Sequence, residues 1–164
     1  MKKPANNLDL SNHRIFARDL DGSKAEKKGF ARERSFLVAL DPEEAASLEE
    51  EGWPVKFLPP KNDEEDGTHF MKVKVGFGKI PPKIVVLNPV TRKKKALNEN
   101  TVIELNWIYI LDVPQMIVRP YNYNLRGREG TSVWLNSIYV TKRVDPFEEK
   151  FSDYADEDDS INED

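Results

Sequence analysis

The chain has no cysteine among its 164 residues and only two histidines, His13 and His69. The missing cysteines exclude disulfides, thiolate zinc sites and a cysteine nucleophile together. The two histidines lie far apart in the sequence, and neither has a further His, Cys or Asp at the spacing of metal ligands. We therefore expect neither a metal site nor a cofactor.

Long apolar runs are also absent, since no stretch approaches 18 apolar residues, and no membrane-spanning helix is predicted. Met1–Asn7 lacks the apolar stretch of a secretory signal. There is no Gly-x-Ser-x-Gly motif and no Walker-type phosphate loop. Glu148–Lys150 has a carboxylate–x–lysine spacing that some nucleases use, but no partner acid on a strand accompanies it. We expect a cytoplasmic protein that is not an enzyme and does not contact membranes.

Charge is abundant and unevenly placed. Asp145–Asp164 holds ten Asp or Glu and one Lys, whereas residues 1–144 carry 24 Lys or Arg against 19 acids. A body with a net charge of about +5 is thus joined to a segment with a net charge of about −9. This arrangement is typical of a protein that binds a polyanion and carries a tethered acidic segment that imitates that polyanion. A role in solubility alone is the alternative. We predict one domain over residues 1–146, with 1–12 flexible, and a disordered acidic tail over 147–164.

The first half of the body predicts short elements. Ser35–Leu40 is typical of a buried strand, and Asp41-Pro42-Glu43-Glu44 opens a helix that ends near Gly52. Asp41 is expected to cap this helix and Glu44 to complete a capping box. Val55–Leu58 predicts another strand. The charged segment Asn12–Arg34 predicts loop or a strand on the body, with no role assigned.

The second half alternates with the period of a strand. Met71, Val73 and Val75 share one side of a predicted strand, and Phe70, Lys72 and Lys74 share the other. Further strands are predicted over 82–87, 101–111, 115–124 and 133–141, with Trp107 and Tyr109 in the core. Residues 124–130 are expected to form a mobile basic loop. Five or more short strands and one helix predict a mainly β fold, a small barrel or sandwich.

Rings and cations share the outward positions of two predicted strands. Single-stranded nucleic acid exposes flat bases and a row of phosphates, so a protein that binds it needs aromatic rings for stacking and cations along the backbone. Alternating lysines are also how edge strands avoid aggregation, and Trp134 fits either face. The candidate contacts are Phe70, Lys72, Lys74, Arg92, Lys93, Lys94, Lys95, Arg119, Tyr121, Tyr123, Arg126, Arg128 and Trp134.

Three stretches together resemble the single-stranded-DNA-binding proteins of bacteriophage replication, the oligonucleotide/oligosaccharide-binding (OB) fold type with an acidic tail. They are the β-rich stretch 70–144, the Val133-Trp134-Leu135-Asn136 entry to the last strand, and the segment 147–164. The resemblance implies a five-stranded barrel with an inserted helix and DNA bound across its concave strand face. It also implies a role in phage DNA replication or recombination in the infected cell.

The resemblance further implies that the acidic tail competes with DNA and contacts a polymerase, helicase or primase. The residues concerned are Asp156, Glu157, Asp158, Asp159, Glu163 and Asp164. Many such tails end in an aromatic residue, whereas here the aromatics lie further back, at Phe147, Phe151 and Tyr154. The partner-docking role is therefore less well supported than the charge role.

Two other classes remain open. A protein-interaction module or inhibitor could use the acidic helix at 41–51 and the acidic loop at 63–66 to mimic DNA. An RNA-binding barrel would use the same rings and cations. The oligomeric state is also open, with a homodimer as one alternative.

Overall fold

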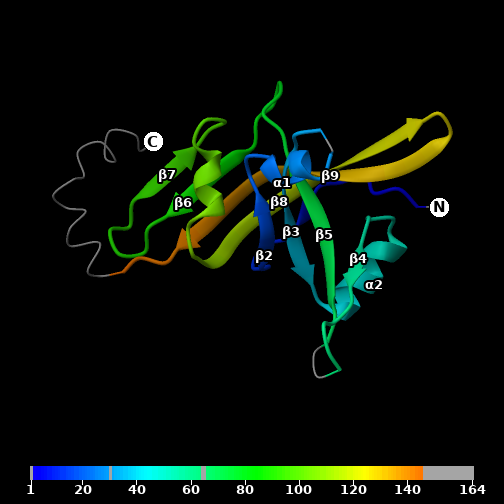
Figure 1. Cartoon of the computed structure of the whole chain (residues 1–164), viewed down its shortest axis with the longest axis horizontal. Coiled ribbons are helices and arrows are strands. Elements are labelled where there is room, and N and C mark those ends of the chain that lie inside the picture. The colour runs from blue at the N-terminus through cyan, green and yellow to red at the C-terminus, as the bar shows by residue number, and fades with distance from the viewer. Residues whose placement is uncertain (1, 30, 64–65, 146–164) are drawn as a thin grey trace.

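The structure, a computed structural model, describes residues 2–29, 31–63 and 66–145 and is mainly β (Figure 1). The strands are β1 Leu8–Asp9, β2 Ile15–Asp19, β3 Arg34–Leu40, β4 Lys56–Leu58, β5 Thr68–Val75, β6 Lys83–Leu87, β7 Lys94–Leu97, β8 Ile110–Leu125 and β9 Arg128–Lys142. The helices are α1 Ser23–Lys27, α2 Pro42–Glu50 and the 3-10 helix η1 Val102–Asn106. The predicted fold class is confirmed.

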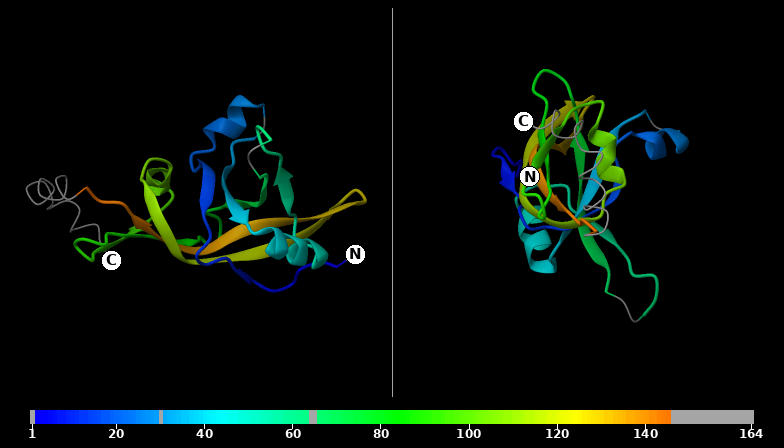
Figure 2. Two further views of the ribbon diagram at one scale, coloured as in Figure 1. Left: turned by 90° about the horizontal axis from the view of Figure 1, so that it is seen from below. Right: turned by 90° about the vertical axis from the view of Figure 1, so that its left-hand side faces the viewer.

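The strands form one mixed sheet in the order β1-β8-β9-β5-β3-β2, with β4 beside β5 and the β6–β7 pair beside β9. Its two parallel pairs are β5–β9 and β6–β9. β1 and β2 stand at opposite ends of the path but are joined by a short stretch of chain. Within that stretch, Leu10 N–H donates to the Met116 carbonyl (2.8 Å) and the Arg14 carbonyl accepts from Ala39 N–H (2.9 Å). The sheet therefore curls back on itself into a barrel-like body (Figure 2, right).

The core lies inside this curl because the strands alternate as their sequences predict. Met71, Val73 and Val75 of β5 point inward, opposite Phe36 and Val38 of β3, and all five are at most 3% exposed. Each such side chain contributes about 1.5–3 kcal/mol on burial. Phe70, Lys72 and Lys74 consequently share the outer face of β5.

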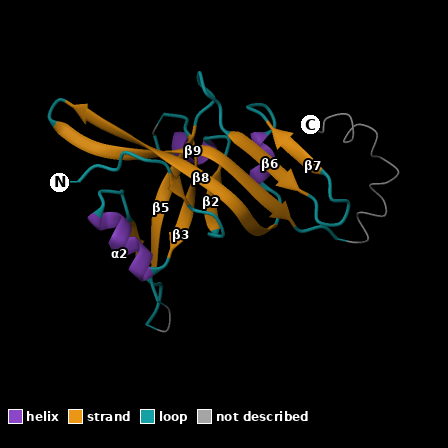
Figure 3. Cartoon of the chain, turned by 180° about the vertical axis from the view of Figure 1, so that it is seen from behind, coloured by secondary structure: helices purple, strands orange, loops and turns teal. Residues whose placement is uncertain are grey.

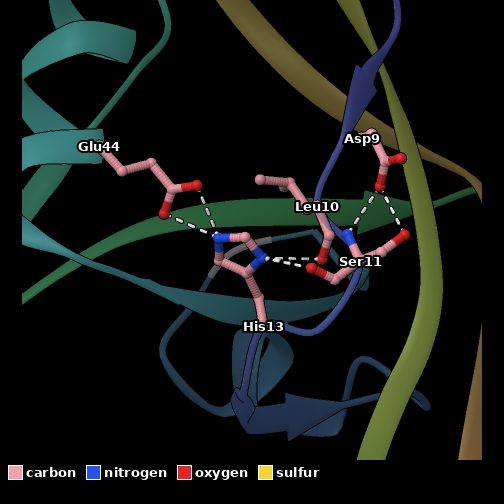
Figure 4. A network of polar contacts seen from close by, with 5 residues as sticks. All are labelled: Asp9, Leu10, Ser11, His13 and Glu44. Atoms are coloured by element: carbon pink, nitrogen blue, oxygen red, sulfur yellow. Dashed lines mark hydrogen bonds and ion pairs between the residues drawn. The ribbon is translucent and has the colours of Figure 1, made fainter.

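Helix α2 begins at Pro42, as predicted, but its capping differs from the expectation. Asp41 occupies the N-cap position without a side-chain cap bond. Glu44 does not complete a capping box; its two carboxylate oxygens each lie 2.7 Å from Nε2 of His13 (Figure 4). The capping-box prediction is wrong because the Glu44 carboxylate binds His13, 31 positions away in the sequence, instead of the helix start.

The predicted strand over 101–111 is also wrong, since η1 occupies residues 102–106. The Asn98 side chain accepts from the backbone N–H groups of Asn100 and Thr101 and so starts a turn. Three residues per 3-10 turn then bury Val102 and Leu105 on one side. Trp107 and Tyr109, expected in the core, are 73% and 63% exposed.

The strands β8 and β9 form a long hairpin that projects from the body (Figure 3). The expected mobile loop over 124–130 is wrong, because Leu125 pairs directly with Arg128. Only Arg126 and Gly127 turn the chain, with φ of 54° and 83°. Positive φ at both central residues is what a two-residue hairpin turn with the right-handed twist of strands requires.

No helix within the described ranges is long and apolar enough to cross a membrane. The six acidic positions singled out in the tail, from Asp156 to Asp164, lie outside the described residues.

Candidate nucleic-acid interface

A hollow of about 580 Å³ opens on the outer face of the sheet, where the end of β5 meets the middle of β8 and β9. The segment after β5 forms one side, and the β8–β9 hairpin forms the other. Its lining residues are Gly76, Gly78, Lys79, Ile80, Arg119, Pro120, Tyr121 and Trp134. We call this hollow the groove. Three of the thirteen candidate contacts, Arg119, Tyr121 and Trp134, meet in it.

Trp134 lies at the centre of a row of side chains that crosses three strands. It is paired with Lys74 on β5 and with Arg119 on β8. The Lys74 ammonium lies 5.6 Å from the centroid of the Trp134 ring. The indole N–H donates to the Ser132 hydroxyl (3.1 Å), which fixes the orientation of the ring. The sequence left the facing of Trp134 open, and the structure places it outside, between two cations.

Gly76 sets how closely the backbone of the β5 end approaches this ring. A Cβ at position 76 would lie 2.8 Å from Cζ3 of Trp134, closer than side chains tolerate. A Cβ at the neighbouring Gly78 would meet nothing within 4 Å. The sequence predicts only a turn from Gly76-Phe77-Gly78. A glycine at the end of an alternating strand is the feature that indicates such a close approach.

The groove combines open apolar surface with positive charge. Tyr121 is 60% exposed and Ile80 68% exposed, so both have surface free for a ligand. Lys79 and Arg119 add two cations, and none of the described residues that line the groove is a carboxylate. Flat rings, an aliphatic side chain and cations together suit a flat, aromatic, anionic ligand, which is the chemistry of an unpaired nucleotide.

The remaining outer-face candidates on β5 already have protein partners. Phe70 packs edge-on against Phe16, with ring centroids 6.2 Å apart, and so lies outside the groove lining. Lys72 and Lys74 both lie 3.6 Å from the same Glu33 oxygen. A phosphate that reached these lysines would therefore compete with one carboxylate for two cations.

The hairpin tip carries three further candidates away from the groove. Arg126 lies in the turn, and Arg128 begins β9. Tyr123 is paired with Gly130, and its hydroxyl would lie 2.3 Å from a Cβ there. The Tyr123 ring thus covers the glycine, as cross-strand aromatic residues do in twisted sheets. The structure does not bring Tyr123 into the groove.

The basic stretch Arg92–Lys95 lies at the β6–β7 turn, at the opposite end of the molecule from the hairpin tip (Figure 1). Lys95 forms an ion pair with Glu104 of η1 (3.0 Å). These cations do not line the groove. Among the described residues, no three His, Asp or Glu side chains gather as metal ligands would.

Comparison with known proteins identifies relatives by family and by fold. The family described as "Putative phage ssDNA-binding domain" matches residues 1–163. Comparison with curated proteins finds no match. Two solved structures of the single-stranded DNA-binding protein from bacteriophage Enc34 share the fold. The C-terminal truncation has a TM-score of 0.52 and 18% identity over 86% of this chain and 88% of that one.

The Enc34 protein in complex with ssDNA has a TM-score of 0.53 and 17% identity over 86% of this chain and 89% of that one. At this identity the likeness shows the fold alone, and that fold is consistent with the OB-type barrel expected from the sequence. The family match covers nearly the whole chain. The protein therefore belongs to the phage ssDNA-binding domain family.

Proposed function

We propose that this protein coats single-stranded DNA without strong sequence preference during phage DNA replication or recombination, inside the infected host cell. The observation that carries the proposal is the groove, which the Trp134 ring lines together with Arg119, Lys79 and the exposed Tyr121, while Lys74 lies 5.6 Å from the centroid of that ring. The bases stack on the two rings, and the phosphates pass the cations. The family to which the chain belongs supports DNA as the polymer.

The groove favours unpaired over paired DNA for a simple reason. The faces of bases in a duplex are covered by their neighbours, whereas an unpaired base can leave the stack and lie against Trp134. Each such base contributes about 1–3 kcal/mol. Because every base has a flat face, this contact does not discriminate between sequences. RNA offers the same faces, so the choice between DNA and RNA is left to the experiment below.

The division of the chain proposed here is a DNA-binding domain over residues 1–146 and an acidic tail over 147–164. Asp156–Asp159, Glu163 and Asp164 compete with the phosphates for the cations of the body. A tethered segment acts at an effective concentration in the millimolar range, so weak attraction suffices. The same acids contact replication proteins once DNA has displaced them.

The test is a comparison of Trp134→Ala and Tyr121→Ala with the native chain, using fluorescent oligo-dT, the matching RNA and a duplex. Each substitution should weaken oligo-dT binding about 5- to 150-fold, the range that one stacked base provides. Phe57→Ala is the control, because Phe57 is an aromatic residue on β4, 52% exposed and outside the groove.

Native affinity for oligo-dT from both groove variants, in folded samples, would contradict the proposal. Tighter binding to RNA than to DNA would transfer the same groove to an RNA-binding function. Binding to neither nucleic acid would favour a protein-interaction module.

A further inference from the structure

A second set of open rings lies at the start of β8, away from the groove. Trp107 is 73% exposed, Tyr109 63% and Leu111 53%. Trp107 and Tyr109 are more exposed than Tyr121 of the groove, and none of the three residues lines it. Large rings exposed together in this way mark interaction surfaces in proteins that are otherwise well packed.

Cations accompany these rings as they accompany Trp134. The Arg143 guanidinium lies 5.3 Å from the centroid of the Tyr109 ring. The backbone N–H of Arg143 also donates to the Tyr109 carbonyl (2.8 Å), which ties the end of β9 to this segment. A ring beside a cation is also the pairing of Trp134 with Lys74.

The basic turn between β6 and β7 lies at the same end of the sheet as these rings. Lys94 pairs with Leu87 of β6, Leu87 with Thr141 of β9, and Thr141 with Asp112 of β8. Three strand spacings separate Lys94 from Asp112, a distance of about 14 Å. The ion pair of Lys95 with Glu104 joins the turn to η1, which Trp107 follows directly.

The local charge is positive. Among the described residues, four cations, Arg92, Lys93, Lys94 and Arg143, lie at this end of the sheet, against Asp112 and Asp145, and the pair of Lys95 and Glu104 is neutral. We call the rings Trp107 and Tyr109 with these four cations the distal surface. Its charge fits a polyanion, and its open rings fit exposed bases.

We propose that the distal surface is a second contact site for the same single strand of DNA. The inference rests on the proposed function of the groove. It extends the path of the bound DNA strand from the groove to the distal surface. Leu111 and Arg119 are eight residues apart on β8, or about 26 Å. A strand that contacts both sites must therefore be longer than one that fills the groove, within the 4–16 nucleotides or so that one OB fold covers.

The test measures oligo-dT binding as a function of length for the Trp107→Ala/Tyr109→Ala double variant. A 4-nucleotide oligo, which is too short to reach from the groove to the distal surface, should bind within about 2-fold of native. A 20-nucleotide oligo should lose about 10-fold or more, as one or two lost stacked bases require. Both side chains are mostly exposed, so the fold should be unchanged by circular dichroism, and Phe57→Ala is the matched control.

A second measurement, the salt dependence of binding, isolates the contribution of the Arg143 charge. Arg143→Gln should lower the slope of log affinity against log salt concentration by about 0.7 for the long oligo, because one phosphate contact is lost. For the 4-nucleotide oligo the slope should not change. Photo-crosslinking of a bromodeoxyuridine 20-mer to the native chain should label Trp107 or Tyr109 in addition to Trp134.

Unchanged binding of the 20-mer by the double variant would overturn the inference. Tighter binding by the double variant would also overturn it and would assign the distal surface to the acidic tail, since removing a tail contact frees cations for DNA. The groove is tested separately by Trp134→Ala. If that variant and Tyr121→Ala both bind normally, the proposed function fails; if only the distal variants bind normally, only this inference fails.

Discussion

At the scale of single residues, the contact between Gly76 and Trp134 determines the geometry of the groove. Because a Cβ at position 76 would lie 2.8 Å from the indole, Gly76→Ala must displace the ring. We expect oligo-dT affinity to fall about 3- to 10-fold, part of one stacking contact. Gly78→Ala is the matched control, because its Cβ meets nothing within 4 Å. Equal affinities of the two variants, measured by fluorescence anisotropy, would show that the position of the ring does not matter.

At the scale of elements, His13 joins the connection between β1 and β2 to α2 (Figure 4). Nδ1 of His13 donates to the carbonyls of Leu10 (3.0 Å) and Ser11 (2.9 Å), and Nε2 faces the Glu44 carboxylate. Burial lowers the pKa of His13, but the bonds to Glu44 and Ser11 outweigh it, so the pKa lies above its ordinary value. Both ring nitrogens face acceptors, which favours the protonated form.

A raised pKa in the folded state has a definite consequence for stability. The contribution of His13 is fully present below its unfolded pKa of about 6.5 and is lost as pH rises through the higher folded pKa. His13→Gln should therefore cost on the order of 1–2 kcal/mol near pH 5.5 and less near pH 9. Urea unfolding across this range measures the difference, with His69→Gln as the control. A cost that does not depend on pH would mean that His13 acts only through packing.

The elements differ in how far the sequence alone predicts them. The strand β5 was predictable because its period of two reflects one buried and one open face, and Met71 to Val75 follow it without exception. The segment from Ile103 to Tyr109 has the same period but forms no strand, and its first part lies in η1. The Asn98 side chain starts a turn there, and Arg18 donates to the Leu105 carbonyl at 2.6 Å. Contacts 87 residues apart in sequence leave no periodic pattern.

At the scale of the whole molecule, the groove is assembled from segments that only the sheet topology brings together. Trp134 and Lys74 are 60 positions apart and become neighbours through the parallel pair β5–β9. The residue types of an aromatic–cation site were predictable from two alternating strands. Which of them meet was not, because Phe70 turns to Phe16 and Tyr123 covers Gly130.

The division of charge along the whole chain leads to the last prediction. A body near +5 attracts both DNA and the chain's own acidic segment, so neutralising that segment should strengthen DNA binding. Replacing Asp156, Glu157, Asp158 and Asp159 by Asn and Gln keeps the length and removes four charges. We expect oligo-dT affinity to rise about 2- to 10-fold at low salt, from competition at millimolar effective concentration.

The gain should shrink as salt is added, because at about 1 M ionic strength the Debye length falls to about 3 Å and both attractions weaken. Substituting the nearby Ser152, Ser160 and Asn162 by Ala provides the control, since it alters the same segment without changing its charge. A titration of affinity against salt for the three chains separates the outcomes. If the neutralised chain and the native chain bind alike at every salt concentration, the acidic segment does not compete with DNA for the cations of the body.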